Sequence, residues 1–283
     1  MIVLDDISYR YRAGLEALNG ITANIPEGIH LLLGENGAGK TTLLHIISGL
    51  LFPNSGSCTI DGIQMMDRQP QGLSKVFLLA DNVDYPQPTL NKFAAVHSPF
   101  YSKFNEELFK ENLSDFGLTG NEKFRSLSLG NKRKSLLAYS LALCTEVLLL
   151  DEPANGLDIG SKQILRRMIA KCADNYSTII ISTHTVNDLE YLFDGVMMLK
   201  RGKLILSESI GNIQNSMSFI TAPVPPLESI FSIPNLGSFR CIVPIHDKVE
   251  SGIDLVLLYL ALQSKEADKV LNLLNSEENN GTV

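Results

Sequence analysis

Short, nearly continuous apolar runs alternate with longer stretches of helix-forming residues over most of the chain. The clearest runs lie at residues 28–33, 75–79, 147–150 and 178–182. Such runs are typical of parallel strands that are buried on both faces of a sheet, because a strand with one exposed face would alternate apolar and polar residues. The pattern therefore predicts an α/β fold with a mostly parallel sheet at its core.

Two regions in the first half of the chain depart from this pattern. Residues 2–9 and 20–25 read as strands joined through a turn region that contains Gly14, which predicts a small antiparallel β layer at the N-terminus. Residues 91–116 are rich in helix formers and carry no strand signal. We therefore expect a helical subdomain, over about residues 85–145, inserted into the core.

The pattern changes again after about residue 210, where prolines punctuate the chain. Strand-like runs at 239–243 and 255–260 precede a helix predicted over about 264–274. We expect one large domain over residues 1–210 and a small α+β extension over 211–283.

The composition restricts the possible classes of protein. Of 283 residues, 45% are hydrophobic and 19% are charged, which favours a sizeable core over disorder. The formal net charge of −7 argues against a broadly basic surface for nucleic acid, so no nucleic-acid partner is expected.

The sequence shows no secretory signal, and no apolar run approaches the roughly 20 residues that cross a bilayer. Any membrane connection is therefore expected through a partner. The four cysteines lack metal-binding spacing and are predicted to be core residues in a reducing compartment: Cys58, Cys144, Cys172 and Cys241.

A glycine-rich phosphate loop follows the strand predicted at 28–33. It matches the pattern G-x-x-x-x-G-K-[ST] and consists of Gly34, Glu35, Asn36, Gly37, Ala38, Gly39, Lys40, Thr41 and Thr42. Its glycines let backbone amides approach phosphate oxygens, Lys40 supplies a charge to the β- and γ-phosphates, and Thr41 is a ligand for Mg²⁺. Thr42 is a further candidate phosphate contact. The alternative is a glycine-rich turn, but the strand before the loop and the helix-like run after it favour a nucleotide site.

Two acids and a histidine follow later buried strands. Asp151 and Glu152 come directly after the run at 147–150, where parallel strands present their carboxyl ends to ligands. We expect Asp151 to hold Mg²⁺ and Glu152 to act as the general base on the attacking water. His184 follows the run at 178–182 and is a candidate catalytic residue, although a lone histidine is more often a structural hydrogen-bonding residue.

Taken together, these motifs resemble those of the ATP-binding subunits of ABC transporters, over residues 1 to about 210. Between the phosphate loop and the acidic pair, residues 127–134 read Leu-Ser-Leu-Gly-Asn-Lys-Arg-Lys, where this family carries its signature sequence. The resemblance implies that Ser128 and Gly130 contact the ATP bound by a second subunit in a head-to-tail dimer. A plain helix N-cap at Ser128 is compatible with that role.

The same resemblance assigns further residues. Asp158 matches the loop after the acidic pair that organises the subunit interface, and His184 matches the histidine that reaches the γ-phosphate. Tyr11 lies where the family places an aromatic ring that stacks on adenine, with Tyr9 as the alternative.

Two departures from the family pattern stand out. Leu129 and Asn131 replace a glycine and a glutamine of the signature, and the leucine is shared with bacterial exporter ATPases of the drug and antibiotic-peptide type. The loop that usually supplies a glutamine to Mg²⁺ and to the membrane partner has Ala80 or Asp81 in that place. The missing glutamine raises the alternative of a cassette with impaired turnover.

By resemblance, the chain is expected to be an ATPase that uses ATP and Mg²⁺, forms a homodimer and powers a separate integral membrane permease, in export. It would then be cytoplasmic and attached to the inner face of the cell membrane through that permease. Two alternatives remain: an ABC-family ATPase outside transport, and a cassette with impaired turnover.

Overall fold

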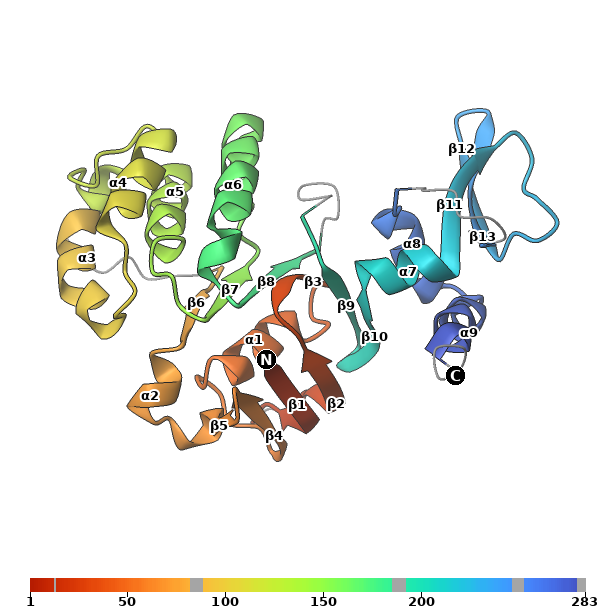
Figure 1. Cartoon of the computed structure of the whole chain (residues 1–283), viewed down its shortest axis with the longest axis horizontal. Helices are drawn as coiled ribbons and strands as arrows, with labels where there is room; N and C mark the ends of the chain where they lie inside the picture. The colour runs from red at the N-terminus through yellow and green to blue at the C-terminus, as the bar shows by residue number, and fades with distance from the viewer. Residues whose placement is uncertain (13, 82–88, 185–191, 246–251, 279–283) are drawn as a thin grey trace. The chain divides into compact units, whose positions relative to one another are not determined.

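The computed structural model describes residues 1–12, 14–81, 89–184, 192–245 and 252–278 (Figure 1). Residues 85–88 of the predicted helical subdomain lie outside this part of the chain. The fold divides into two compact units, one of Met1–Phe193 with Leu199–Leu204 and one of Asp194–Met198 with Ile205–Val283.

The central sheet is mostly parallel, as the apolar runs predict. In spatial order it contains β10 (Lys203–Ser209), β9 (Gly195–Lys200), β3 (Gly28–Gly34), β8 (Thr178–Thr183), β7 (Val147–Asp151) and β6 (Val76–Leu79). β3 pairs with β8, β8 with β7, and β7 with β6, all in parallel. The register places Leu33 beside Thr183 and Asp151 beside Ser182, so the carboxyl ends of three strands meet at one edge.

An antiparallel sheet forms the predicted N-terminal layer. Its order is β2 (Glu16–Ile25), β1 (Ile2–Arg10), β4 (Ser55–Ile60) and β5 (Ile63–Gln64). The first two strands confirm the prediction. β4 and β5 were not predicted, because the small residues that begin β4 carry little strand propensity; pairing with β1 decides the conformation there.

Outside the predicted insertion, the described part of the first unit contains the helices α1 (Lys40–Ile47), α2 (Pro70–Leu73) and α6 (Ile159–Cys172). The predicted helical insertion contains α3 (Leu90–His97), α4 (Glu106–Asp115) and α5 (Leu129–Ser140), which lie together in Figure 1. Tyr139 of α5 is fully buried, and its ring packs against four phenylalanines: Phe77, Phe93, Phe104 and Phe109. This aromatic cluster fixes α5 against β6, α3 and α4.

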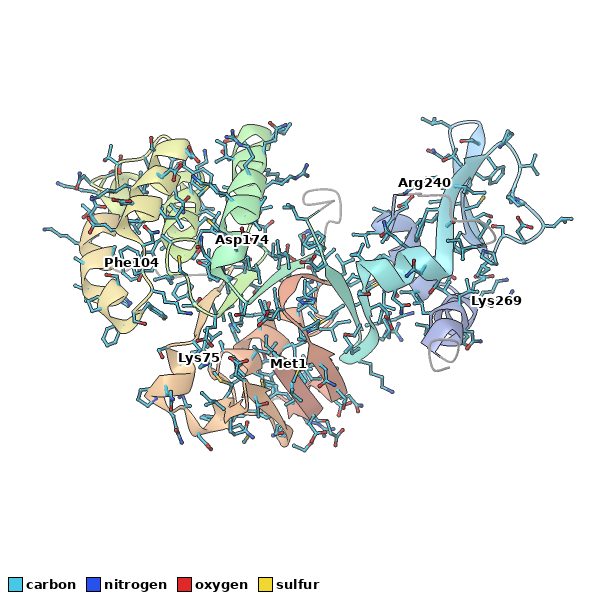
Figure 2. All side chains as sticks on the ribbon, in the orientation of Figure 1. Met1, Lys75, Phe104, Asp174, Arg240 and Lys269 are labelled. Carbon is cyan, nitrogen blue, oxygen red and sulfur yellow. The ribbon has the colours of Figure 1, made fainter. Side chains whose placement is uncertain are left out.

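The second unit contains α7 (Ile210–Ser216), α8 (Leu255–Gln263), α9 (Ala267–Glu278) and an antiparallel sheet in the order β11 (Met217–Ala222), β13 (Ser238–Pro244), β12 (Phe231–Asn235). The prediction of a strand at residues 255–260 was wrong, because these residues belong to α8. Asp254 caps this helix by accepting from the Leu257 amide at 2.9 Å. Arg240, which is labelled in Figure 2, donates through Nε to the same carboxylate at 2.6 Å. Leucine and alanine favour helix once such a cap is in place.

The four cysteines are buried and free, as expected for core residues. None of the helices in the described part of the chain combines the length and the apolar character that a membrane crossing requires.

Candidate functional site

The phosphate loop joins β3 to α1 through a backbone that requires glycine. Gly39 has φ 109° and stands at the N-cap of α1. A Cβ atom there would lie 2.6 Å from the Ala17 carbonyl oxygen and 2.7 Å from Leu18 Cδ2. Because both the backbone angle and the close approach exclude a side chain, the loop is held in one conformation, with α1 beginning directly at its end.

Lys40 is a buried cation enclosed by its own loop. Its Nζ donates to the carbonyl oxygens of Gly34 at 2.7 Å and Glu35 at 3.3 Å, and lies 3.7 Å from Glu152 Oε1. Burial lowers the pKa of Lys40, and the negative charges of Glu152 and Asp151 partly offset that effect. A cation with little water around it is well suited to an anionic ligand such as a phosphate.

Asp151 connects the phosphate loop to the sheet. Thr41 Oγ1 donates to one carboxylate oxygen at 2.7 Å, and Ser182 Oγ donates to the other. A hydroxyl and a carboxylate are hard oxygen ligands that suit Mg²⁺. No group of three or more His, Cys, Asp or Glu among the described residues is spaced to hold a metal ion. Mg²⁺ usually takes one or two protein ligands together with phosphate and water.

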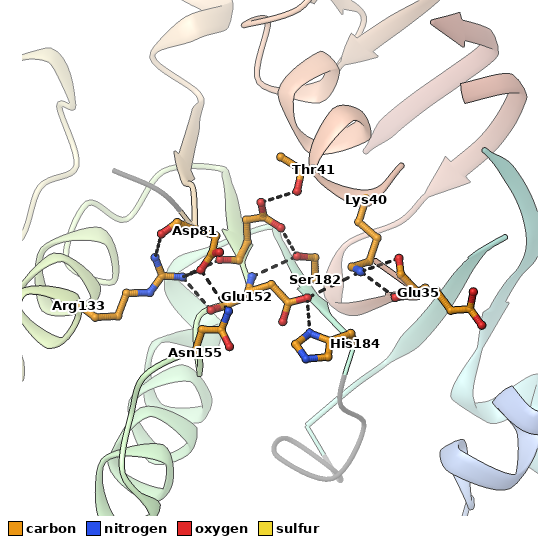
Figure 3. Close-up of polar contacts among 11 residues, drawn as sticks. Glu35, Lys40, Thr41, Asp81, Arg133, Glu152, Asn155, Ser182 and His184 are labelled. Atoms are coloured by element: carbon orange, nitrogen blue, oxygen red, sulfur yellow. Dashed lines mark hydrogen bonds and ion pairs between the residues drawn. The ribbon is translucent and has the colours of Figure 1, made fainter. Parts of the chain in front are cut away.

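Glu152 faces the same space and meets His184 (Figure 3). Its Oε1 lies 2.9 Å from His184 Nδ1. Glu152 has φ 47°, in the left-handed region that side chains other than glycine rarely adopt, and its amide donates to the Ser182 carbonyl oxygen at 3.1 Å. Strained backbone of this kind is concentrated at functional sites.

A second polar cluster lies beside the acidic pair. Arg133 of α5 donates to the carbonyl oxygens of Ala80, Asp81, Asp151 and Glu152 at 2.6–3.0 Å. Asn155 Nδ2 donates to Asp81 Oδ1 at 3.3 Å. Asp81 is one of the two residues, with Ala80, that stand where the family pattern has a glutamine, and it is tied to both α5 and the loop after the acidic pair.

A cavity of about 450 Å³ brings most of the predicted site residues together. It is lined by Tyr11, Leu15, Glu16, Ala17, Glu35, Asn36, Gly37, Gly39, Lys40, Thr41, Thr42, Asp81, Asp151, Glu152, Asn155 and His184. This volume is in the range of small-molecule sites. Of the two candidate aromatic residues, Tyr11 lines the cavity, and its hydroxyl lies 2.9 Å from Thr42 Oγ1.

The remaining predicted site residues lie elsewhere. Gly34 and Ala38 belong to the phosphate loop but do not line the cavity. Ser128 is the N-cap of α5 and accepts from the Asn131 amide, with Gly130 in the first turn. Asp158 is the N-cap of α6 and forms an ion pair with Lys134. The cavity of a single chain thus contains neither signature residue nor Asp158.

Sequence reasoning missed Ser182 and Arg133. Ser182 is a polar residue directly after the apolar run at 179–181 of β8 and next to Asp151 in the register, and that was a usable signal. Arg133 had none, because its partners are backbone oxygens from distant segments.

The chain is similar to known proteins of one family. The family model described as ABC transporter matches residues 18–155. The protein YdbJ of Bacillus subtilis, described as an uncharacterized ABC transporter ATP-binding protein, is 32% identical over 222 residues, which are 75% of this chain and 71% of YdbJ. The chain belongs to the family of ABC transporter ATP-binding proteins. It is accordingly an ABC-type ATPase.

Two further ABC family members show how far the likeness extends. The lantibiotic transport ATP-binding protein SrtF of Streptococcus pyogenes is 31% identical over 206 residues, which are 70% of this chain and 86% of SrtF. A solved ATP-binding cassette, a dimer in a post-hydrolysis state with ADP and Pi, superposes with a TM-score of 0.65 at 23% identity, over 74% of this chain and 99% of that one. That likeness confirms the α/β fold predicted from the sequence.

Proposed function

We propose that the chain is the ATP-hydrolysing subunit of an ABC transporter and that it powers a separate membrane permease in export. The position of the Glu152 carboxylate is the main support for ATP hydrolysis by this chain. The Glu152 carboxylate lies in the same cavity as the phosphate loop, 2.9 Å from His184 Nδ1 and 3.7 Å from Lys40 Nζ. A carboxylate held by a histidine next to a phosphate-binding cation can take a proton from an attacking water.

Each residue then has a distinct task. Lys40 and the loop amides bind the β- and γ-phosphates. Thr41 and Asp151 would hold Mg²⁺, which would supply positive charge to the phosphate oxygens. Glu152 orients the water and accepts its proton, and His184 fixes the carboxylate through the Nδ1 contact.

A second copy of the chain completes the site in this proposal. Ser128 and Gly130 stand at the N-terminus of α5, where backbone amides attract an anion, but they do not line the chain's own cavity. In a head-to-tail homodimer the signature of one copy closes on the γ-phosphate held by the other. Asp158 then lies at the interface of the two copies.

The hydrolytic role is tested with Glu152→Gln. We expect phosphate release to fall by about three orders of magnitude while ATP binding stays within about threefold of the wild type, because the amide keeps the shape but cannot accept the proton. The matched control is Glu107→Gln, which makes the same change on the exposed side of α4. A wild type as slow as Glu152→Gln would show a cassette with impaired turnover, the alternative that the missing glutamine raises. A Glu152→Gln variant as fast as an active wild type would show that Glu152 is not the general base.

Transport and location depend on the partner. Export is proposed from Leu129, which matches exporter ATPases, and from the likeness to SrtF, whose name assigns it to lantibiotic transport. The chain would then be cytoplasmic and held at the membrane by its permease. Purification of the tagged chain from membranes should recover a polytopic membrane protein. Recovery of ribosomes or DNA instead would favour an ABC ATPase outside transport.

A further inference from the structure

Arg133 lies beside the acidic pair and donates to four main-chain carbonyl oxygens. Its side chain is 5% exposed. Nη1 donates to the carbonyl oxygens of Ala80 at 2.9 Å and Asp81 at 3.0 Å. Nη2 donates to those of Asp151 at 2.6 Å and Glu152 at 2.8 Å. One guanidinium thus joins α5 to two loops that are far apart in the sequence (Figure 3).

The contact with Glu152 reaches a strained part of the backbone. Glu152 has φ 47°, and such a conformation persists only where the surroundings hold it. Its amide donates to Ser182 at 3.1 Å, and its carbonyl oxygen accepts from Arg133 at 2.8 Å. The peptide groups on both sides of the Glu152 Cα atom are therefore fixed, one by β8 and one by α5. The direction of the Glu152 side chain follows from these two contacts.

Arginine is suited to this place for physical reasons. Its planar guanidinium carries several donors in a fixed geometry, so it can serve two pairs of carbonyl oxygens at once, and it stays charged even when buried. The Asp81 carboxylate, 3.7 Å from Nη2, adds a counter-charge. A lysine has a single ammonium and loses its proton more readily on burial.

We propose that Arg133 is a positioning residue for ATP hydrolysis. It holds the Glu152 backbone in the conformation that aims the carboxylate into the cavity, and it links that backbone to Asp81 and to α5. Because Ser128 caps α5 and Gly130 lies in its first turn, a displacement of the helix at the signature is transmitted to Glu152 through one side chain. The role rests on the proposed function, since it assigns Arg133 to the reaction at Glu152.

The test compares Arg133→Gln and Arg133→Lys with Arg125→Gln, which removes an exposed arginine three residues before Ser128. Steady-state ATPase rates of the full chain give kcat and KM, and the melting temperature reports folding. We expect Arg133→Gln to lower kcat by about 30-fold with KM within about threefold, because misplacement of a catalytic group by an ångström costs on the order of 100-fold. Arg125→Gln should match the wild type.

Arg133→Lys supplies a second readout, which a merely structural role would not move. Lysine keeps the charge, so kcat should recover in part at neutral pH. It should then fall at alkaline pH as the buried ammonium loses its proton, whereas the wild type has no titrating group at position 133. This extra alkaline limb supports the proposal even if Arg133→Gln does not fold.

Two results would overturn the proposal: a folded Arg133→Gln with wild-type kcat, or an Arg133→Lys profile parallel to that of the wild type. Failure of the proposed function looks different, because the wild type itself would then turn over ATP no faster than Glu152→Gln.

Discussion

Gly39 shows how a single missing side chain allows the phosphate loop to form. A Cβ atom at this position would collide with the Ala17 carbonyl oxygen and with Leu18, both on β2. The phosphate loop therefore packs directly against the N-terminal antiparallel layer. That contact places the start of α1 and, with it, Lys40 and Thr41.

Gly39→Ala should destabilise the protein more than a positive φ alone explains. Left-handed backbone costs a non-glycine residue roughly 1–2 kcal/mol, and forcing an atom into a packed site adds about 1–3 kcal/mol. We expect a loss of about 3 kcal/mol in the free energy of unfolding, measured by denaturant titration. The control is Gly62→Ala, because Gly62 has φ 78° but no atom within 4 Å of its Cβ position. Equal losses in both variants would contradict the steric argument.

Tyr11 is the second residue at which a prediction can be made. It lines the cavity, whereas Tyr9 contacts it edge-on with ring centroids 5.0 Å apart. If Tyr11 stacks on adenine, Tyr11→Ala should weaken ATP binding about 10-fold, since an aromatic–base stack contributes roughly 1–3 kcal/mol. Tyr11→Phe should keep most of the affinity. Titration with a fluorescent ATP analogue measures the affinity of both variants. A larger loss of affinity in Tyr9→Ala than in Tyr11→Ala would assign the stacking role to Tyr9.

The predicted site residues belong to a local sequence motif or stand at the end of an apolar run, so the sequence alone could indicate them. Lys40 and Thr41 sit in a local motif, Asp151 ends β7 and His184 follows β8, and all four line the same cavity. Arg133 could not be found in this way. Its four acceptors are main-chain oxygens, which have no sequence signal, and they come together only when β6, β7 and α5 pack.

At the scale of helices and strands, Asp158 connects the loop after the acidic pair to α6. Its carboxylate accepts from the Ser161 amide and hydroxyl, both at 2.8 Å. These hydrogen bonds, the backbone one foremost, and the nearby Lys134 lower the pKa of Asp158 from 3.8 to about 2. The start of α6 is therefore stabilised by a charged cap.

This cap should contribute to acid unfolding. Because the folded pKa is depressed, the contribution is complete above the unfolded value of 3.8 and is lost as the pH falls towards about 2. Asp158→Asn keeps a capping side chain but cannot titrate, so its melting temperature should fall less steeply between these two pH values. Asp174→Asn is the control, because Asp174 is exposed and lies in the short 3-10 turn Ala173–Asn175 that follows α6. Identical slopes for the wild type and Asp158→Asn would contradict the prediction.

Strand prediction succeeded where burial alone determines the conformation and failed where pairing or capping does. β3, β7 and β8 each contain an apolar run of three or four residues, and the structure buries nearly all of their residues. β4 forms because β1 offers it an edge, and α8 forms because Asp254 caps it. Neither cause can be read from hydrophobic periodicity.

At the scale of the whole molecule, the question is which chain supplies the signature to a given ATP. The cavity contains the phosphate loop, Glu152 and His184, but not Ser128 or Gly130. Lys40→Ala disables the phosphate loop of its own chain, and Gly130→Asp places a carboxylate at the N-terminus of α5, where it repels phosphate. If the signature acts in trans, each variant alone is inactive.

Mixing the two variants should restore activity. In a mixed dimer, the intact phosphate loop of the Gly130→Asp chain meets the intact signature of the Lys40→Ala chain, so one site of two is complete. With half of the dimers mixed, ATPase activity should return to about a quarter of the wild type if the sites act independently, as additivity of separate sites implies. A mixture of Lys40→Ala with Glu152→Gln leaves no complete site, because both changes disable the phosphate-loop side, and it should stay inactive. A signature that acted within its own chain would give no recovery in either mixture.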